Sequence, residues 1–159
     1  MPQELDSIAP NFKLVSVDGD TVSLPRPGVP TLFIACSTTC AYCERSIPAW
    51  QRVAESICSV DIVIAAATTD ELLASHWQGR AIAGCANVII GNVLEPEGVS
   101  TDYRISGTPR HYLIAADGTF RQAWYGMVEG RRSIRRFLAG LIAASEPALR
   151  AAVDRMLEE

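Results

Sequence analysis

The segment PTLFIACSTTCAYC, residues 30–43, joins an apolar run to three of the five cysteines of the chain. Residues 31–36 form a short, continuous apolar stretch, which is typical of a strand buried on both faces. From Ala41 to about Ile57 the apolar residues recur at three- and four-residue spacing, which predicts an amphipathic helix. The motif Cys40-Ala41-Tyr42-Cys43 therefore lies where a buried strand turns into a helix.

The rest of the chain alternates between strand-like and helix-like patterns. Such alternation indicates a sheet that contains parallel strands and is covered on both faces. We therefore predict an α/β protein with a mixed central sheet flanked by helices on both faces, an N-terminal β-hairpin and an extra C-terminal helix. The predicted elements are a hairpin (12–17 and 21–24), a strand (31–36), a helix (41–57), a strand (60–67), a helix (69–83), a strand (86–91), a short helix (96–106), a hairpin (107–126), a helix from Glu129 with Ile142 on its apolar face, and a terminal helix from near Pro147.

The length of the chain fits one domain with a hydrophobic core. Its 159 residues are 48% hydrophobic and 20% charged, as in soluble globular proteins. We assign residues 1–159 to a single domain with a core of about residues 7–144 and a C-terminal helical extension over residues 146–159.

Charge and hydropathy argue against two classes of partner. A net charge of −4, from 14 basic and 18 acidic residues, gives no electrostatic footprint for nucleic acid. No apolar run approaches the roughly 18 residues that span a bilayer. The first residues lack the basic and apolar regions of a signal peptide, so we expect a cytoplasmic protein. If the chain is a trimmed piece of a longer protein, a periplasmic or membrane-anchored location stays open.

The two cysteines of the Cys-x-x-Cys motif are predicted to have unequal roles. A helix N-terminus offers partial positive charge and unpaired N–H groups, which favour a thiolate. We therefore expect the pKa of Cys40 alone to fall below the ordinary value of about 8.5. Cys40 is then the exposed nucleophile and Cys43 the buried resolving thiol, and the pair cycles between dithiol and disulfide without a cofactor.

A metal site is the main alternative for these thiols. Zinc sites usually need two close pairs of ligands, and none of the remaining cysteines and histidines forms a second close pair. We therefore expect no metal, and we interpret Cys36, Cys58 and Cys85 as structural. His111 is a candidate for a group that titrates near the site. The remaining ligand candidates are Cys36, Cys58, Cys85, His76 and His111.

Thr108-Pro109 precedes the apolar strand of the last hairpin. Proline cannot donate a hydrogen bond to a sheet, so a proline that opens a strand needs an explanation. A cis peptide bond is one explanation, and it would leave the backbone of Thr108 free to pair with an incoming peptide. An ordinary trans proline at the start of a strand is the alternative.

Together these segments resemble the thioredoxin-fold redoxins, the group that includes TlpA-like thiol–disulfide oxidoreductases and the alkyl hydroperoxide reductase/thiol-specific antioxidant family. The resemblance covers roughly residues 7–140. It is carried by APNFKLVSVDGDTVSL (9–24), by PTLFIACSTTCAYC (30–43) and, most specifically, by YRISGTPRHYLIAADGTF (103–120).

The resemblance implies a thioredoxin-like fold and a thiol–disulfide oxidoreductase in which Cys40 attacks and Cys43 resolves. It also implies that Pro109 is cis and that Thr108 lies in the substrate groove, with Thr39 and Tyr42 beside the cysteines. The expected partners are a protein or small-molecule thiol or disulfide, and an upstream reductant or oxidant such as a thioredoxin-type protein.

The sequence departs from the usual redoxin pattern beside the cysteines. Thr39 stands where tryptophan is usual, Tyr42 where many members have proline, and Ile34 where thioredoxins carry a buried acid. The proton acceptor for Cys43 is therefore unassigned; Glu44, Glu95 and Glu97 are the nearby acidic candidates.

Three alternatives to disulfide exchange stay open from the sequence. A peroxiredoxin-like thiol peroxidase would use Cys40, with Ser37 at the hydroxyl position and Arg110 near the thiolate, but Phe33 stands where proline is expected. The other two are a metal-binding protein, for copper among other metals, and a non-catalytic thioredoxin-fold adaptor.

Overall fold

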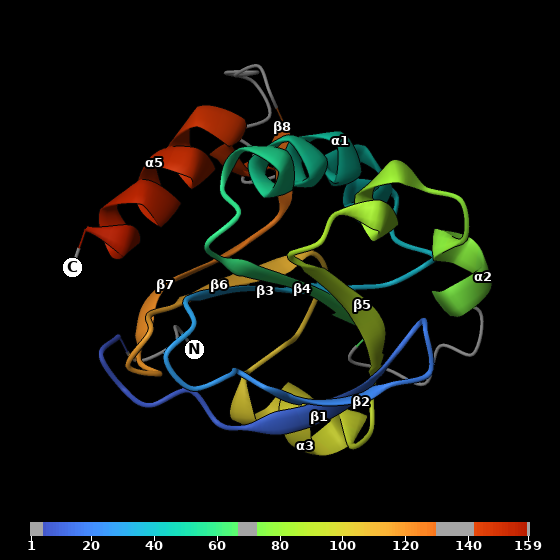
Figure 1. Cartoon of the computed structure of the whole chain (residues 1–159), viewed down its shortest axis with the longest axis horizontal. Helices are drawn as coiled ribbons and strands as arrows, with labels where there is room; N and C mark the ends of the chain where they lie inside the picture. The colour runs from blue at the N-terminus through green and yellow to red at the C-terminus, as the bar shows by residue number, and fades with distance from the viewer. Residues whose placement is uncertain (1–4, 67–72, 130–141, 159) are drawn as a thin grey trace.

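A seven-stranded mixed sheet forms the centre of the computed structural model, which describes residues 5–66, 73–129 and 142–158 (Figure 1). Its strands lie in the order β2-β1-β5-β4-β3-β6-β7. The three central strands β3, β4 and β5 are parallel, whereas the hairpins β1–β2 and β6–β7 add antiparallel strands at the two edges. The strands are β1 (Phe12–Ser16), β2 (Thr21–Leu24), β3 (Thr31–Cys36), β4 (Asp61–Ala66), β5 (Val88–Val93), β6 (Arg110–Ile114) and β7 (Phe120–Tyr125).

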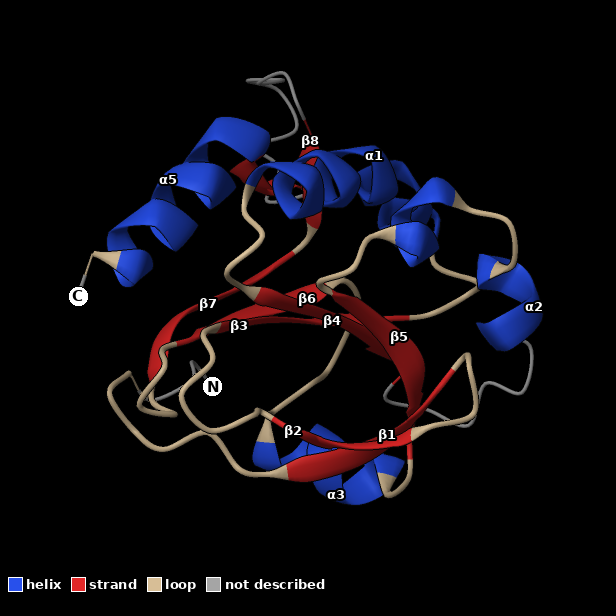
Figure 2. Ribbon diagram, viewed as in Figure 1, coloured by secondary structure: helices blue, strands red, loops and turns tan. Residues whose placement is uncertain are grey.

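Helices cover both faces of this sheet (Figure 2). The helices α1 and α5 lie on one side of it and α3 lies on the other (Figure 1). In the part of the chain that the structure describes, no helix is long and apolar enough to cross a membrane. The helices are α1 (Ala41–Ser56), α2 (Leu73–Trp77), the 3₁₀ helix η1 (Ala81–Gly84), α3 (Pro96–Asp102) and α5 (Glu146–Leu157), and a small parallel sheet pairs β8 (Met127–Glu129) with β9 (Ile142–Ser145).

Alternation along β3 divides the core into two layers. Successive side chains of a strand point to opposite faces, so Leu32, Ile34 and Cys36 join the cluster beneath α1. Phe33 and Ala35 join the cluster on the other face, together with Tyr103, which follows α3, and aromatic residues of the last hairpin. The full burial of β3 on both faces confirms the prediction made from its continuous apolar run.

The helix α1 is held by β8 and α5 as well as by the sheet. Ser46 is buried; its hydroxyl donates to the Tyr42 carbonyl at 2.7 Å and accepts from the Val128 amide of β8 at 2.9 Å. Arg52 forms an ion pair of 2.8 Å with Glu146, the first residue of α5. Apolar residues of α5 complete the same cluster as α1; they are Leu149, Ala152, Val153 and Met156.

The prediction of one continuous helix over residues 69–83 is wrong for the residues that the structure describes. The chain forms α2 and then the separate 3₁₀ helix η1. Between them Gly79 has a φ of 76°, in the left-handed region that glycine adopts without steric cost. This backbone conformation ends the helical path, which the apolar periodicity did not indicate.

The helix predicted from Glu129 is also wrong at both ends. Glu129 ends β8 and Ile142 begins β9, and the two strands pair in parallel. Hydrogen bonding between strands therefore replaces the expected helical pattern at these residues. The remainder of that prediction, residues 130–141, lies outside the described residues. The terminal helix predicted near Pro147 is confirmed as α5.

Gly91 permits the close approach of β1 to β5. A Cβ atom added at this position would lie 2.2 Å from the Val15 carbonyl oxygen, which is backbone and cannot turn aside. We predict that Gly91→Ala lowers the free energy of unfolding by about 1–3 kcal/mol, because the two strands must separate to admit the methyl group. Urea unfolding followed by far-UV circular dichroism measures this change, and an unchanged midpoint would contradict the proposed contact.

Candidate redox site

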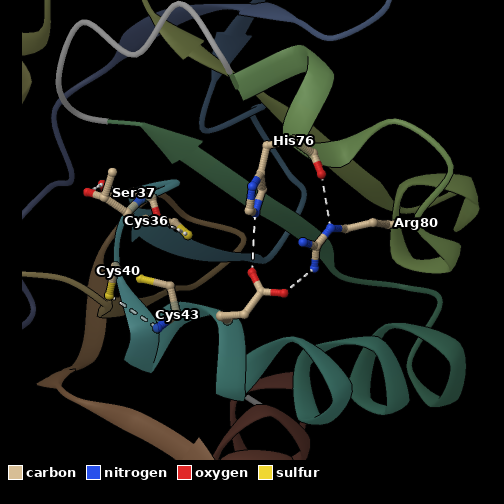
Figure 3. A network of polar contacts seen from close by, with 8 residues as sticks. Cys36, Ser37, Cys40, Cys43, His76 and Arg80 are labelled. Carbon is tan, nitrogen blue, oxygen red and sulfur yellow. Dashed lines mark hydrogen bonds and ion pairs between the residues drawn. The ribbon is translucent and has the colours of Figure 1, made fainter.

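Three sulfur atoms meet where β3 gives way to α1 (Figure 3). Cys36 is the last residue of β3 and only 3% exposed, and Cys43, in the first turn of α1, is 1% exposed. Cys40 lies between them in the sequence and is partly exposed. All three are free thiols. The site therefore has one sulfur within reach of solvent and two beneath it.

The position of Cys40 is set by the start of the helix. Cys40 is the N-cap residue of α1, and its sulfur accepts a hydrogen bond from the Cys43 amide at 3.1 Å. This bond pairs one of the amides that a helix N-terminus leaves without a partner. The predicted arrangement, a cysteine at the strand end that opens the helix, is thus present.

The loop before β6 lies against Cys40. The Cys40 thiol donates to the Thr108 carbonyl oxygen at 3.4 Å, although the two residues are 68 positions apart in the sequence. The peptide bond between Thr108 and Pro109 is cis. Pro109 is buried and Thr108 is partly exposed. The fold therefore brings together Cys40, Cys43, Thr108 and Pro109, which the sequence analysis singled out.

Thr39 and Tyr42 flank Cys40 in the sequence, and both are exposed. The Thr39 amide donates to the Ser37 hydroxyl at 3.3 Å, and the hydroxyl groups of the two residues lie 3.1 Å apart. These bonds order the turn between β3 and α1. The Tyr42 side chain, 39% exposed, is one of the few large apolar groups on the surface.

The electrostatics of the thiols differ from the prediction. Hydrogen bonding from the Cys36 thiol, helped by the Cys40 thiol, lowers the pKa of Cys43 to about 6, while burial opposes this fall. Burial and the contact with Cys43 raise the pKa of Cys40, although the Thr108 side chain and the Cys43 amide act in the other direction. The prediction of a lowered pKa for Cys40 alone is therefore wrong.

The contact between Cys40 and Cys43 determines which of the two side chains is the thiolate. The proximity of the two side chains lowers the pKa of Cys43 and raises that of Cys40, which favours the Cys43 thiolate and the Cys40 thiol. When Cys40 attacks a substrate, the neighbouring Cys43 thiolate can accept its proton. The geometry can thus activate the exposed sulfur without a carboxylate, by a base that is itself a thiolate.

The acidic residues considered as proton acceptors for Cys43 do not lie beside its sulfur. Glu44 lies on α1, but its carboxylate forms an ion pair with Arg80 at 2.7 Å and lies 3.3 Å from the His76 imidazole (Figure 3). Glu95 occupies the N-cap position of α3 without a side-chain capping bond, and Glu97 lies in the first turn of that helix, on the far side of the sheet from α1 (Figure 1). None of these three carboxylates lies at the thiols, so the idea that the Glu95–Glu97 segment approaches the site is not supported.

His111 does not titrate near neutral pH, contrary to the sequence interpretation. The side chain is fully buried and accepts a hydrogen bond from the Trp50 indole at 3.0 Å. Its ring stacks on Trp124, with 5.4 Å between ring centroids. Burial lowers the pKa of His111 to about 3, so the imidazole is neutral and serves packing.

Arg110 points away from the thiols. Arg110 and Tyr112 are two residues apart on β6 and so face the same side of the sheet, the side covered by α3. The guanidinium group lies 3.9 Å from the ring centroid of Tyr125 and 5.2 Å from that of Tyr112. Cys40 packs against the opposite cluster. An arginine beside the reactive sulfur, which the peroxidase alternative needs, is therefore not supplied by Arg110.

The other two cysteines lie at the far end of α1. Cys58 follows this helix, whose 16 residues span about 24 Å, and it lines a surface cavity of about 390 Å³ together with Cys85. The structure thus separates Cys58 and Cys85 from the three-thiol site. Within the described residues, no group of three or more histidine, cysteine, aspartate and glutamate side chains could hold a metal ion.

Comparison with known proteins agrees with this fold. No protein-family model matches the chain. The "Thioredoxin-like protein YneN" of Bacillus subtilis is 24% identical over 119 residues, which cover 74% of this chain and 69% of the relative. This similarity supports the resemblance to the thioredoxin-fold redoxin superfamily.

Two solved structures share the architecture. The thioredoxin domain of a thiol–disulfide oxidoreductase from Bacteroides vulgatus has a TM-score of 0.64 at 19% identity, over 76% of this chain and 88% of that domain. A secreted disulfide oxidoreductase of Mycobacterium tuberculosis has a TM-score of 0.65 at 18% identity, over 91% of this chain and 95% of that protein. The chain therefore has the thioredoxin-like fold.

The lowered pKa of Cys43 makes the stability of the reduced protein depend on pH. Between a folded pKa of about 6 and an unfolded value near 9, the unfolded chain holds a proton that the folded chain has released. We therefore predict that the free energy of unfolding rises from pH 7 to pH 8.5 under reducing conditions. His111 contributes only below about pH 6.5, because burial lowers its pKa.

Urea titrations at the two pH values, with a phosphine reductant present, measure this rise. Cys43→Ala should remove most of it, whereas Cys58→Ala should retain it because Cys58 is exposed and lies outside the cluster. An equal pH slope in the wild-type and Cys43→Ala proteins would show that Cys43 carries no lowered pKa.

Proposed function

We propose that the protein is a thiol–disulfide oxidoreductase that uses Cys40 as the attacking thiol and Cys43 as the resolving thiol. The observation that carries the proposal is the placement of Cys40: its partly exposed sulfur caps α1 and contacts the Thr108 carbonyl beside the cis-proline. Cys43 lies beneath it, almost fully buried. One accessible and one protected sulfur are what the two steps of disulfide exchange require.

The reaction proceeds through a mixed disulfide. Cys40 gives its proton to the Cys43 thiolate as its sulfur attacks one sulfur of a substrate disulfide, and the other substrate sulfur leaves as a thiolate. Cys43 then transfers its proton to that leaving thiolate, and its sulfur attacks Cys40. The second substrate thiolate departs and the Cys40–Cys43 disulfide forms. The substrate gains two electrons and the protein loses two; the reverse sequence oxidises a substrate dithiol.

The proposed substrate surface surrounds Cys40. Thr39 and Tyr42 are exposed on the helix side, and Thr108 with Pro109 lies on the loop side. An extended peptide that carries a cysteine can place its backbone beside Thr108 while its sulfur meets Cys40. We therefore propose a protein or small-molecule thiol or disulfide as substrate, and a thioredoxin-type protein as the partner that restores the active form.

The compartment determines the direction of electron flow. Cytoplasmic thiols are kept reduced, so there the protein would act as a reductant, whereas an oxidising compartment would make it an oxidant. The Mycobacterium tuberculosis protein with the same fold is secreted and is called a disulfide oxidoreductase. Equilibration with glutathione buffers, followed by mass spectrometry of the Cys40–Cys43 pair, measures the reduction potential that separates the two directions.

We predict that Cys40→Ser lowers the rate of disulfide exchange by at least about 100-fold, because the variant has no sulfur at the exposed position. Cys43→Ser should still attack, but it should accumulate a stable mixed disulfide between Cys40 and the substrate. Reduction of insulin by dithiothreitol reports the rate, and intact-mass spectrometry with glutathione disulfide reports the adduct.

Cys58→Ser is the matched control, because it removes a thiol outside the site and should leave the rate unchanged. Exchange that persists in Cys40→Ser would refute the proposal. Rapid hydrogen peroxide consumption by the wild type, with little disulfide exchange, would favour the peroxidase alternative. Binding of a partner protein by a Cys40→Ser/Cys43→Ser variant, with no exchange activity in the wild type, would favour a non-catalytic adaptor.

A further inference from the structure

Cys36 lies in the same buried cluster as Cys43, the proposed resolving thiol. It ends β3 on the face that α1 covers, and its sulfur points toward the first turn of the helix, where Cys43 lies (Figure 3). The Cys36 thiol donates to the Ser37 carbonyl oxygen at 3.7 Å, a long hydrogen bond, and its sulfur lies in the same buried cluster as the Cys43 sulfur. Two residues earlier on the same face of β3 the chain has Ile34, which is apolar and fully buried. Cys36 is thus the polar side chain that this face of β3 presents to Cys43.

We propose that Cys36 is a positioning residue whose thiol hydrogen turns from the Ser37 carbonyl to the Cys43 sulfur and holds that sulfur as a thiolate for exchange. The inference rests on the proposed function, since it assigns to Cys36 a role in preparing Cys43. Cys36 takes no part in bond making and keeps its proton throughout. The Cys43 sulfur first accepts the proton of Cys40 and later forms the disulfide bond to the Cys40 sulfur.

The surroundings of Cys36 make it a donor rather than a nucleophile. With 3% of its surface exposed, it cannot meet a substrate. The contact with Cys43 and burial raise its pKa well above the ordinary value, so it stays a thiol at neutral pH. A buried thiol with a raised pKa attacks disulfides poorly, but it can stabilise a neighbouring thiolate.

The other groups around Cys43 do not replace this contact. The Cys40 thiol is a second donor, but it is the group that reacts. The Ser37 backbone and the Thr108 side chain make smaller contributions that also lower the pKa of Cys43. Among the titratable and charged residues of the neighbouring elements, His76 and Arg80 both contact Glu44. His111 faces α1 from β6, but it is neutral and bonded to Trp50.

The test compares substitutions that remove the donor with one that retains it. Cys36→Val fills a similar volume without a polar hydrogen, Cys36→Ala removes the donor and leaves a small space, and Cys36→Ser keeps a hydroxyl donor. Each is made with Cys58→Ser and Cys85→Ser, so that only the site thiols titrate. Cys40→Ser is added for spectroscopy, and thiolate absorbance at 240 nm is followed from pH 4 to pH 10.

We expect the first thiolate midpoint to rise by about one to two pH units in the valine and alanine variants, because a hydrogen bond to a charged group is lost. The serine variant should show a smaller rise. A midpoint that stays within about 0.3 units in both donor-free variants would overturn the proposal. Because two donor-free variants of different size are used, a folding defect in one leaves the other informative.

The rate of resolution gives a second readout that packing alone would not produce. With Cys40 present, resolution of a glutathione mixed disulfide should be roughly two- to sixfold slower at pH 6 in Cys36→Val, because loss of thiolate outweighs the gain in nucleophilicity. At pH 8.5 the rates should be equal, or the variant faster. Equal slowing at both pH values would indicate a general packing defect and would overturn the proposal.

Oxidation of the Cys40→Ser protein with glutathione disulfide tests the competing role. Accumulation of a Cys36–Cys43 disulfide, mapped by peptide mass spectrometry, would identify Cys36 as a redox partner and refute a pure donor role. Absence of that disulfide supports the donor. The spectroscopic midpoint needs no exchange activity, so it can succeed or fail independently of the proposed function, which the Cys40→Ser exchange assay tests.

Discussion

The hydrogen bond from the Cys43 amide to the Cys40 sulfur is the contact on which the site depends. It makes the reactive thiol part of the helix cap, so the place where α1 begins also decides where Cys40 sits. The buried strand β3 fixes that place in turn, because it must end before the chain can turn into the helix. The boundary between β3 and α1 therefore fixes the position of the reactive sulfur, a task that supporting side chains perform in other sites.

Because side chains alternate along β3 and β6, the reactive and charged side chains are divided between the two faces of the sheet. Cys36 and His111 face α1, whereas Arg110 and Tyr112 face α3. The cationic group thus lies across the sheet from the thiols, and the histidine on the thiol side is kept neutral by burial. Charge at the site is carried by sulfur and stabilised by thiol and backbone donors, which suits a reaction that passes electrons between sulfur atoms.

Much of this arrangement follows from short-range patterns in the sequence. The continuous apolar run of residues 31–36 indicated a buried strand, and the spacing from Ala41 indicated the helix. Contact between Cys36 and Cys43 could not be predicted, because it depends on how closely the helix packs on the sheet. The predicted order of the thiol pKa values was wrong for the same reason. Burial of Cys40 raises its pKa by more than the helix N-terminus lowers it. The pairing of β8 with β9 was missed because partners distant in the sequence decide it.

The contacts between α5 and α1 determine how much of the chain is needed to hold the cysteines in place. Ser46 binds β8 one turn below the cysteines, Arg52 binds the first residue of α5, and the apolar side of α5 completes the cluster that contains Cys43. The C-terminal helix α5 is therefore part of the same hydrophobic core and does not lie outside it. A shortened version that ended after β7 would remove the contacts of α1 with β8 and α5, so the smallest fragment that can keep the cysteines in register extends through α5.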